Sequence, residues 1–96
     1  MQVKGLRRAL RNLEKEAARL AHDNLQVAAA LISAVDESTR LLARHPDMGR
    51  PGRVPGTREL TLPHSAYIIP YRVKEQRGEI LRVFHTSRKW SQGDAF

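Results

Sequence analysis

The chain contains no cysteine, which excludes both a disulfide framework and a thiolate metal site. No apolar run approaches the roughly 18 residues that a membrane span requires, and the N-terminus lacks the apolar core of a signal peptide. Three histidines, His22, His45 and His64, fall at expected helix ends or in a turn, and their spacing fits no metal-ligand pattern. We therefore expect a cytoplasmic protein that needs no metal, no cofactor and no membrane.

Acidic residues are also scarce, with 10 Asp and Glu against 17 Lys and Arg, which gives a net charge of +7. The surplus is 2 in residues 1–48 (8 against 6) and 5 in residues 49–96 (9 against 4). Such a basic half attracts polyanions, either nucleic acid or an acidic protein. A basic surface that serves solubility alone is the simpler alternative.

The 96 residues suffice for one domain, near the lower size limit at which a single core holds a fold. After Trp90 the chain becomes small and polar, reading Ser-Gln-Gly-Asp-Ala before the last residue. We expect one domain over residues 1–90 and a flexible tail over residues 91–96.

Two amphipathic helices are predicted in the first half of the chain. In residues 6–21 the apolar side chains recur every three or four positions, which places them on one helical face. Asp23 or Asn24 can cap a second helix, and Gln26 completes a weak capping box. Pro46 ends that helix because the residue before a proline disfavours helical geometry. So short a connection makes the helices antiparallel neighbours, in a helical hairpin.

Three strands are predicted in the second half, over residues 58–62, 67–73 and 79–84. These runs are rich in β-branched, aliphatic and aromatic residues and are bounded by turn residues. Residues 2–4 form a possible opening strand. Pro70 cannot donate a hydrogen bond to a sheet, so it implies a bulge or a locally unpaired position. The order β-α-α-β-β-β predicts an α+β fold, with the helical hairpin packed on a small antiparallel sheet.

Basic residues are spread along these strands and their connector. Residues 47–56 contain three glycines and two prolines, which disfavour a regular element, and two arginines that either are solvated or contact phosphates or carboxylates. Arg58, Arg72 and Arg82 lie on separate predicted strands, and Arg82 is expected on the solvent face. If the three share one face, they form a cationic stripe; the alternative is an ordinary solvated face.

The end of the predicted domain combines charge with aromatic and imidazole rings. An exposed Trp beside Arg, as in Arg88-Lys89-Trp90, is a frequent anchor in protein interfaces, although the indole can equally pack under the sheet. His85, at the end of the last predicted strand, is either a general base or a packed cap. The candidate residues for binding a target or partner are Arg58, Arg72, Arg82, His85, Arg88, Lys89 and Trp90.

Three sequence blocks are specific enough to suggest a family. Residues 49–60 read GRPGRVPGTREL, residues 67–73 read YIIPYRV, and residues 79–85 read EILRVFH and are followed by Arg88. In this order and spacing they resemble the RelE/ParE superfamily of toxins from bacterial type II toxin–antitoxin modules, and the ParE-like members more closely. The resemblance covers residues 2–90 and implies the same α+β fold.

The resemblance implies one of two targets. RelE-like members cleave messenger RNA on the ribosome, whereas ParE-like members lack that nuclease machinery and poison DNA gyrase. Where RelE carries lysines on its second strand this chain has Glu59 and Thr61, and Ile68 stands at an arginine position. Because most of that cationic cage is missing, the resemblance favours a ParE-like toxin that binds DNA gyrase and performs no covalent chemistry.

An enzymatic alternative stays open. Another nuclease branch of the superfamily uses a histidine-tyrosine pair at the end of the last strand, and His85 matches the histidine while Thr86 replaces the tyrosine. With Arg58 and Arg88, His85 would form the catalytic site of a ribosome-dependent mRNA endoribonuclease, whose partners are the ribosome and mRNA.

A partner is implied in either case. The resemblance implies a cognate ParD- or RelB-like antitoxin that forms a hetero-oligomer with the chain. Its acidic, amphipathic C-terminal segment would wrap the toxin, lie over the helices, extend the sheet and fold only on binding. A third interpretation is a remnant that binds its antitoxin without harming cells, because the sequence departs from the family pattern at Gly5, Arg19-Leu20 and Leu25.

Overall fold

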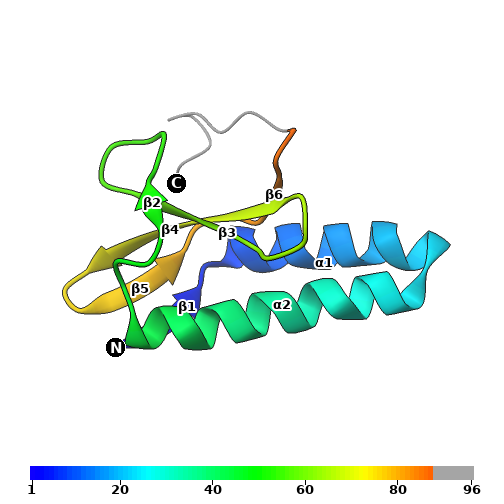
Figure 1. Cartoon of the computed structure of the whole chain (residues 1–96), viewed down its shortest axis with the longest axis horizontal. Coiled ribbons are helices and arrows are strands. Elements are labelled where there is room, and N and C mark those ends of the chain that lie inside the picture. Colours follow the sequence, from blue (N-terminus) through cyan, green and yellow to red (C-terminus); the bar gives the residue numbers. More distant parts are fainter. Residues whose placement is uncertain (88–96) are drawn as a thin grey trace.

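The computed structural model describes residues 1–87 of the chain. One layer consists of two helices lying side by side, and the other is a six-stranded sheet (Figure 1). The elements are β1 (Gln2–Gly5), α1 (Arg7–Asp23), α2 (Leu25–Arg44), β2 (Arg50–Pro51), β3 (Arg58–Thr61), β4 (Tyr67–Lys74), β5 (Arg77–Ile80) and β6 (Phe84–His85). The predicted α+β class is confirmed, and the expected tail over residues 91–96 lies outside the described residues.

The sheet is mixed rather than wholly antiparallel. Its strand order is β1-β5-β4-β3-β2, and β6 pairs with β4 beyond the end of β5. All neighbours run antiparallel except β1, which runs parallel to β5 with Gln2 opposite Arg77 and Gly5 opposite Ile80. The opening strand is therefore confirmed. Its direction could not be predicted, because so short a run contains no information about its partner.

Asn24 separates the two helices and caps the second one. Its side-chain oxygen accepts hydrogen bonds from the N–H groups of Gln26 at 2.9 Å and Val27 at 3.2 Å. Of the two predicted caps this is the one that forms, since Asp23 is the last residue of α1. The second helix ends at Arg44, two residues before Pro46, as predicted.

The central strand β4 separates two apolar clusters. The cluster beneath the helices comprises Ala9, Leu31, Val35, Leu42, Leu60, Leu62, Tyr67, Ile69, Tyr71, Ile80 and Val83. The cluster on the other side comprises Val54, Ile68, Leu81 and Phe84. We call these sides the helix face and the outer face. Because successive residues of a strand alternate between faces, odd-numbered residues of β4 point to the helix face and even-numbered ones to the outer face.

A bulge interrupts the ladder opposite Pro70. Tyr71 pairs with Ile80 and Ile68 pairs with Phe84, so two residues of β4 stand opposite the three residues 81–83. The Pro70 carbonyl still accepts a hydrogen bond from the N–H of Leu81 at 2.9 Å. The bulge predicted from the proline is thus present, in the partner strand, and the predicted strand over residues 79–84 is divided into β5 and β6.

A two-residue turn joins β4 to β5. Glu75 and Gln76 both adopt left-handed conformations, with φ of 53° and 62°. The strand β5 consequently begins at Arg77, two residues before its predicted start. Turns of this kind usually contain Asn-Gly or Asp-Gly, and Glu75-Gln76 is neither, so the sequence does not locate the turn at this pair.

Candidate functional site

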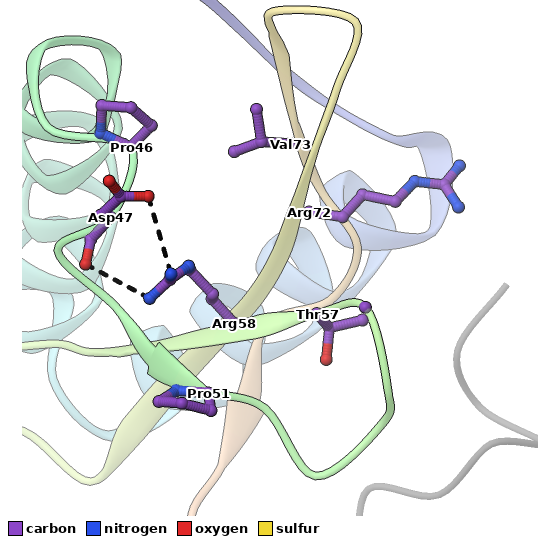
Figure 2. Close-up of a pocket in the computed structure, with 8 residues that line it drawn as sticks. Pro46, Asp47, Pro51, Thr57, Arg58, Arg72 and Val73 are labelled. Carbon is purple, nitrogen blue, oxygen red and sulfur yellow. Dashed lines mark hydrogen bonds and ion pairs between the residues drawn. The ribbon is translucent and has the colours of Figure 1, made fainter.

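Arg58 lies on the helix face because its partner on β4 is Tyr71. Its Nη1 donates to the Gly49 carbonyl oxygen at 2.7 Å, and its Nη2 lies 3.6 Å from Asp47 Oδ1. Figure 2 shows the side chain directed at Asp47 in a pocket of about 370 Å³. Arg58 therefore fastens the connector after α2 to the sheet, while 39% of its side chain remains exposed.

Arg72 points to the outer face, away from Arg58 (Figure 2). It stands opposite Glu79 on β5, and its Nε lies 2.6 Å from Glu79 Oε1. Both side chains are 27% exposed. Arg72 thus forms a half-buried, charge-assisted pair across two strands.

Arg82 is buried, so the expectation that it faces solvent is wrong. Only 5% of the residue is exposed, and its Nη1 donates to the Leu81 carbonyl oxygen at 2.7 Å. The bulge over residues 81–83 interrupts the alternation of the faces, so the pattern of the neighbouring residues does not assign Arg82 to either face. With Arg58 on the helix face and Arg72 on the outer face, the three arginines do not form the cationic stripe considered from the sequence.

His85 ends β6 opposite Tyr67. The two rings meet edge to face with their centroids 5.5 Å apart. The imidazole Nδ1 accepts a hydrogen bond from the Ser87 N–H at 3.2 Å and lies 2.8 Å from Ser87 Oγ. A small hollow of about 100 Å³ beside the ring is lined by Lys15 and Glu16 of α1. His85 therefore both packs against an aromatic ring and opens onto a polar site.

A three-residue network that the sequence did not reveal adjoins His85. The Tyr67 hydroxyl donates to Glu16 Oε1 at 2.8 Å, and Arg19 Nη2 donates to both Glu16 Oε1 and the Tyr67 hydroxyl at 2.9 Å. Burial raises the pKa of Tyr67, and the hydrogen bond to Glu16 raises it further. Burial also acts to raise the pKa of Glu16, but the hydrogen bonds from Arg19 and Tyr67 together with the charge of Arg19 outweigh it and lower that pKa.

His85 and Arg58, two members of the set proposed for RNA cleavage, stand at different positions along β4. His85 is paired with Tyr67 at one end of β4, and Arg58 is paired with Tyr71 four residues further along. At about 3.3 Å per residue, these positions lie roughly 13 Å apart along the strand. Arg88, like Lys89 and Trp90, lies outside the described residues.

Glu59 is a buried carboxylate on β3 that contacts two arginines of the connector. It is 2% exposed, and its Oε2 accepts a hydrogen bond from the Arg53 N–H at 2.9 Å. Its Oε1 lies 3.4 Å from Arg50 Nη2 and 3.5 Å from Arg53 Nε. A carboxylate is retained in such a place only when it is hydrogen-bonded and paired. The two connector arginines therefore contact a carboxylate, which is one of the alternatives that the sequence left open. These contacts hold the loop over residues 50–57 on the outer face.

Two apolar hollows open on the helical side. One, of about 400 Å³, lies between the turn that joins the helices and the β3–β4 loop, and includes Leu20 and Val27. The other, of about 290 Å³, includes Leu10 and Ile32. Val27, Leu10 and Ile32 are 46%, 52% and 49% exposed, although they are apolar. Such grooves between helices are suited to an amphipathic segment of another protein.

In the part of the chain that the structure describes, no group of three or more His, Asp or Glu residues could hold a metal ion. No helix among residues 1–87 is long and apolar enough to cross a membrane.

Comparison with known proteins identifies the family. Residues 3–90 match the family model described as "ParE toxin of type II toxin-antitoxin system, parDE". The chain belongs to the ParE toxin family. A related protein named "Putative toxin Y4kP", from Sinorhizobium fredii (strain NBRC 101917 / NGR234), is 41% identical over 85 residues, which cover 88% of each protein. The resemblance inferred from the sequence is confirmed.

Two solved structures are similar to this ParE-family chain. A chain of the chromosomal ParDE toxin–antitoxin system from P. aeruginosa is 28% identical, with a TM-score of 0.79 over 88% of this chain and 95% of that one. A chain of the toxin–antitoxin complex RelBE2 from Mycobacterium tuberculosis is 27% identical, with a TM-score of 0.62 over 88% of both chains. The fold is therefore that of the RelE/ParE superfamily, and the likeness to the ParDE chain is the stronger of these two.

Proposed function

We propose that this ParE-family chain inhibits growth by binding DNA gyrase, and that a cognate antitoxin neutralises it. The observation that carries the proposal is the match of residues 3–90 to the ParE toxin family. The higher TM-score with the ParDE chain, 0.79 against 0.62 for the RelBE2 chain, favours the ParE-like target over the RelE-like one. Toxin, antitoxin and target are then all partners in the bacterial cytoplasm.

Inhibition by binding requires different affinities for two states of the target. A protein that binds the DNA-cleaved state of gyrase more tightly than the resealed state shifts the enzyme towards the cleaved state. Among the candidate contacts, Arg58, Arg72 and His85 keep exposed atoms and remain proposed target contacts, whereas Arg82 is too buried to serve. The segment from Arg88 to Trp90 stays a sequence-based candidate.

The antitoxin is proposed to bind on the helical side. The exposed apolar side chains around the two hollows would accept the apolar face of an amphipathic segment. The outer strands of the described sheet are β1 and the two-residue β2, so an extended segment could add to either edge. The net charge of +7 favours an acidic segment, and the result is a toxin–antitoxin hetero-oligomer.

A supercoiling assay with purified gyrase tests the proposal. The chain should inhibit supercoiling and increase cleaved DNA, and an equimolar amount of the antitoxin encoded beside it should reverse both effects. The chain mixed with antitoxin beforehand is the control. Supercoiling that proceeds unchanged at a large excess of the chain over gyrase would contradict the proposal.

The site around His85 favours one alternative, a RelE-like ribosome-dependent mRNA endoribonuclease. Imidazole, phenol and carboxylate groups from His85, Tyr67 and Glu16 occur together there, and such groups serve in proton transfer. Its partners would be the ribosome and mRNA. Cleavage of translated messages by the wild-type chain, lost in His85→Ala, would support this alternative. Full toxicity of His85→Ala would eliminate it.

A further inference from the structure

Four cations gather on the outer face near the β4–β5 turn. Lys74 and Arg77 stand directly opposite each other on β4 and β5. In the next row, Lys4 on β1 and Arg72 on β4 stand on either side of Glu79. Because residues in register share a face of the sheet, all four cations point away from the helices. We call Lys4, Arg72, Lys74 and Arg77 the cationic patch.

The charges of the patch are accessible and mutually repulsive. Lys4, Lys74 and Arg77 are exposed, and Arg72 keeps its pairing with Glu79 at 2.6 Å. Like charges directly opposite each other on neighbouring strands destabilise a sheet. The pair formed by Lys74 and Arg77 therefore costs stability in the free protein, and a polyanion lying over the pair would remove that cost.

The loop over residues 50–57 extends this positive surface. Glu59 stands opposite Pro70 on the outer face and holds Arg50 and Arg53, whose side chains are 60% and 43% exposed. From Pro70 to Lys74 the strand advances about 13 Å. Duplex DNA presents about eight phosphate charges over that length, counted over both strands. The surface is thus long enough for several phosphate contacts.

We propose that the cationic patch binds the phosphate backbone of duplex DNA independently of base sequence. A protein partner usually needs exposed apolar anchors, and these lie elsewhere on the molecule. Residues 1–87 contain eight exposed large apolar side chains, and five of them belong to the helices. Of the other three, Met1 and Val73 lie on the helix face and Met48 lies in the connector after α2. The patch therefore suits a ligand that is recognised by charge.

The choice of duplex over single-stranded nucleic acid rests on the aromatic rings. Single strands bind through bases that stack on exposed rings. Tyr67, Tyr71 and Phe84 are all at most 6% exposed, so the rings within residues 1–87 offer no such platform. Contacts with a regular backbone need only well-placed cations. This inference holds whether or not gyrase is the target, because the DNA contact is made by the chain itself.

Fluorescence anisotropy with the full chain and a labelled 24-base-pair duplex of arbitrary sequence tests the inference. The triple variant Lys4→Gln, Lys74→Gln, Arg77→Gln should weaken binding at least about tenfold at low salt, and should reduce the slope of log K against log salt by about 2 to 3. The matched control is Arg11→Gln, Arg40→Gln, Arg44→Gln, which removes the same charge from the helices. It should change the affinity by less than about threefold.

Each other outcome contradicts the inference. Absence of duplex binding by the wild-type chain, or equal losses in the two triple variants, would show that the patch is no DNA site. A patch variant that keeps its DNA affinity but loses antitoxin affinity would identify a protein interface instead. Stronger binding of the single strand of the same sequence would contradict the choice of duplex. Circular dichroism of both variants establishes that they are folded. The supercoiling assay is interpreted independently of DNA binding, because the DNA contact does not depend on gyrase.

Discussion

The Tyr71 hydroxyl accepts a hydrogen bond from the backbone N–H of Gly49 at 2.9 Å and donates one to the Pro46 carbonyl oxygen at 2.8 Å. Tyr71 lies in the middle of β4 and is 0% exposed, whereas its two partners belong to the connector after α2. A Cβ at position 49 would lie 2.6 Å from the tyrosine ring, so glycine permits this approach. One phenol thus joins the end of the helical layer to the sheet.

We therefore expect Tyr71→Phe to lower the free energy of unfolding by about 1 to 3 kcal/mol, because it leaves a buried N–H group without its acceptor. Urea denaturation measures this loss. The control is Tyr67→Phe, whose partners Arg19 and Glu16 have 59% and 20% of their side chains exposed and can bind water instead. A loss in the control equal to or larger than that in Tyr71→Phe would contradict the assigned role.

The two tyrosines also predict a loss of stability in alkali. Burial raises the pKa values of Tyr67 and Tyr71 above the ordinary 10.0. The folded chain then holds these protons more tightly than the unfolded chain, so their contribution is complete below pH 10 and is lost as pH rises through the folded-state values. Denaturation at a series of alkaline pH values should show a steeper decline in the wild type than in the double variant Tyr67→Phe, Tyr71→Phe. Parallel declines would show that other groups are responsible.

Glu16 predicts the opposite dependence in acid. Its pKa lies below the ordinary 4.5: burial acts to raise it, but the hydrogen bonds from Arg19 and Tyr67 together with the charge of Arg19 outweigh that effect. Its contribution to stability is therefore present above pH 4.5 and is lost as pH falls through the lowered value. Glu16→Gln should reduce stability at neutral pH and flatten the acid limb of the stability curve. Glu14→Gln, at an exposed position two residues away on α1, is the charge-matched control and should cost less stability at neutral pH than Glu16→Gln.

Sequence periodicity predicted the parts of the fold that depend on local patterns. The amphipathic spacing gave both helices, and Pro46 and Pro70 correctly marked a helix end and a bulge. The register beyond Pro70 could not be obtained, because the pattern alone does not say which strand takes the extra residue. Arg82 lies in this bulged segment, and it is 5% exposed although the sequence predicts that it faces solvent.

The candidate site depended even more on contacts between distant parts of the chain. Glu16 and Arg19 have a spacing that brings them together on a helix, but their bond to Tyr67 spans 51 residues from Glu16 and 48 from Arg19. In the sequence, Glu59 is an ordinary polar residue of a strand in which polar and apolar side chains alternate. Its burial follows from the loop over residues 50–57, whose path the glycines and prolines permit without specifying it.

Glu59 leads to a prediction about that loop. Glu59→Gln keeps the shape of the side chain but removes the charge that holds Arg50 and Arg53, so we expect a loss of about 1 to 3 kcal/mol in unfolding free energy. Amide hydrogen exchange at Arg53 and Thr57 should accelerate more than exchange in β4. The control Glu79→Gln removes a carboxylate that is 27% exposed, against 1% for Glu59, and should cost less than about 1 kcal/mol. Unchanged exchange in the loop would contradict the role of Glu59 as its anchor.

Val27 permits a test of the antitoxin site that separates binding from stability. It is 46% exposed beside the larger apolar hollow, and its N–H donates to Asn24 Oδ1 at 3.2 Å at the start of α2. A glutamate at this third helical position completes a capping box with Asn24 and interacts favourably with the helix dipole. Val27→Glu should therefore keep or slightly raise the melting temperature. It should also weaken antitoxin binding at least about tenfold, because a carboxylate would be desolvated in an apolar groove. The control Val27→Leu keeps the groove apolar and should bind the antitoxin normally in calorimetry. Normal binding of the antitoxin by Val27→Glu would place the antitoxin elsewhere.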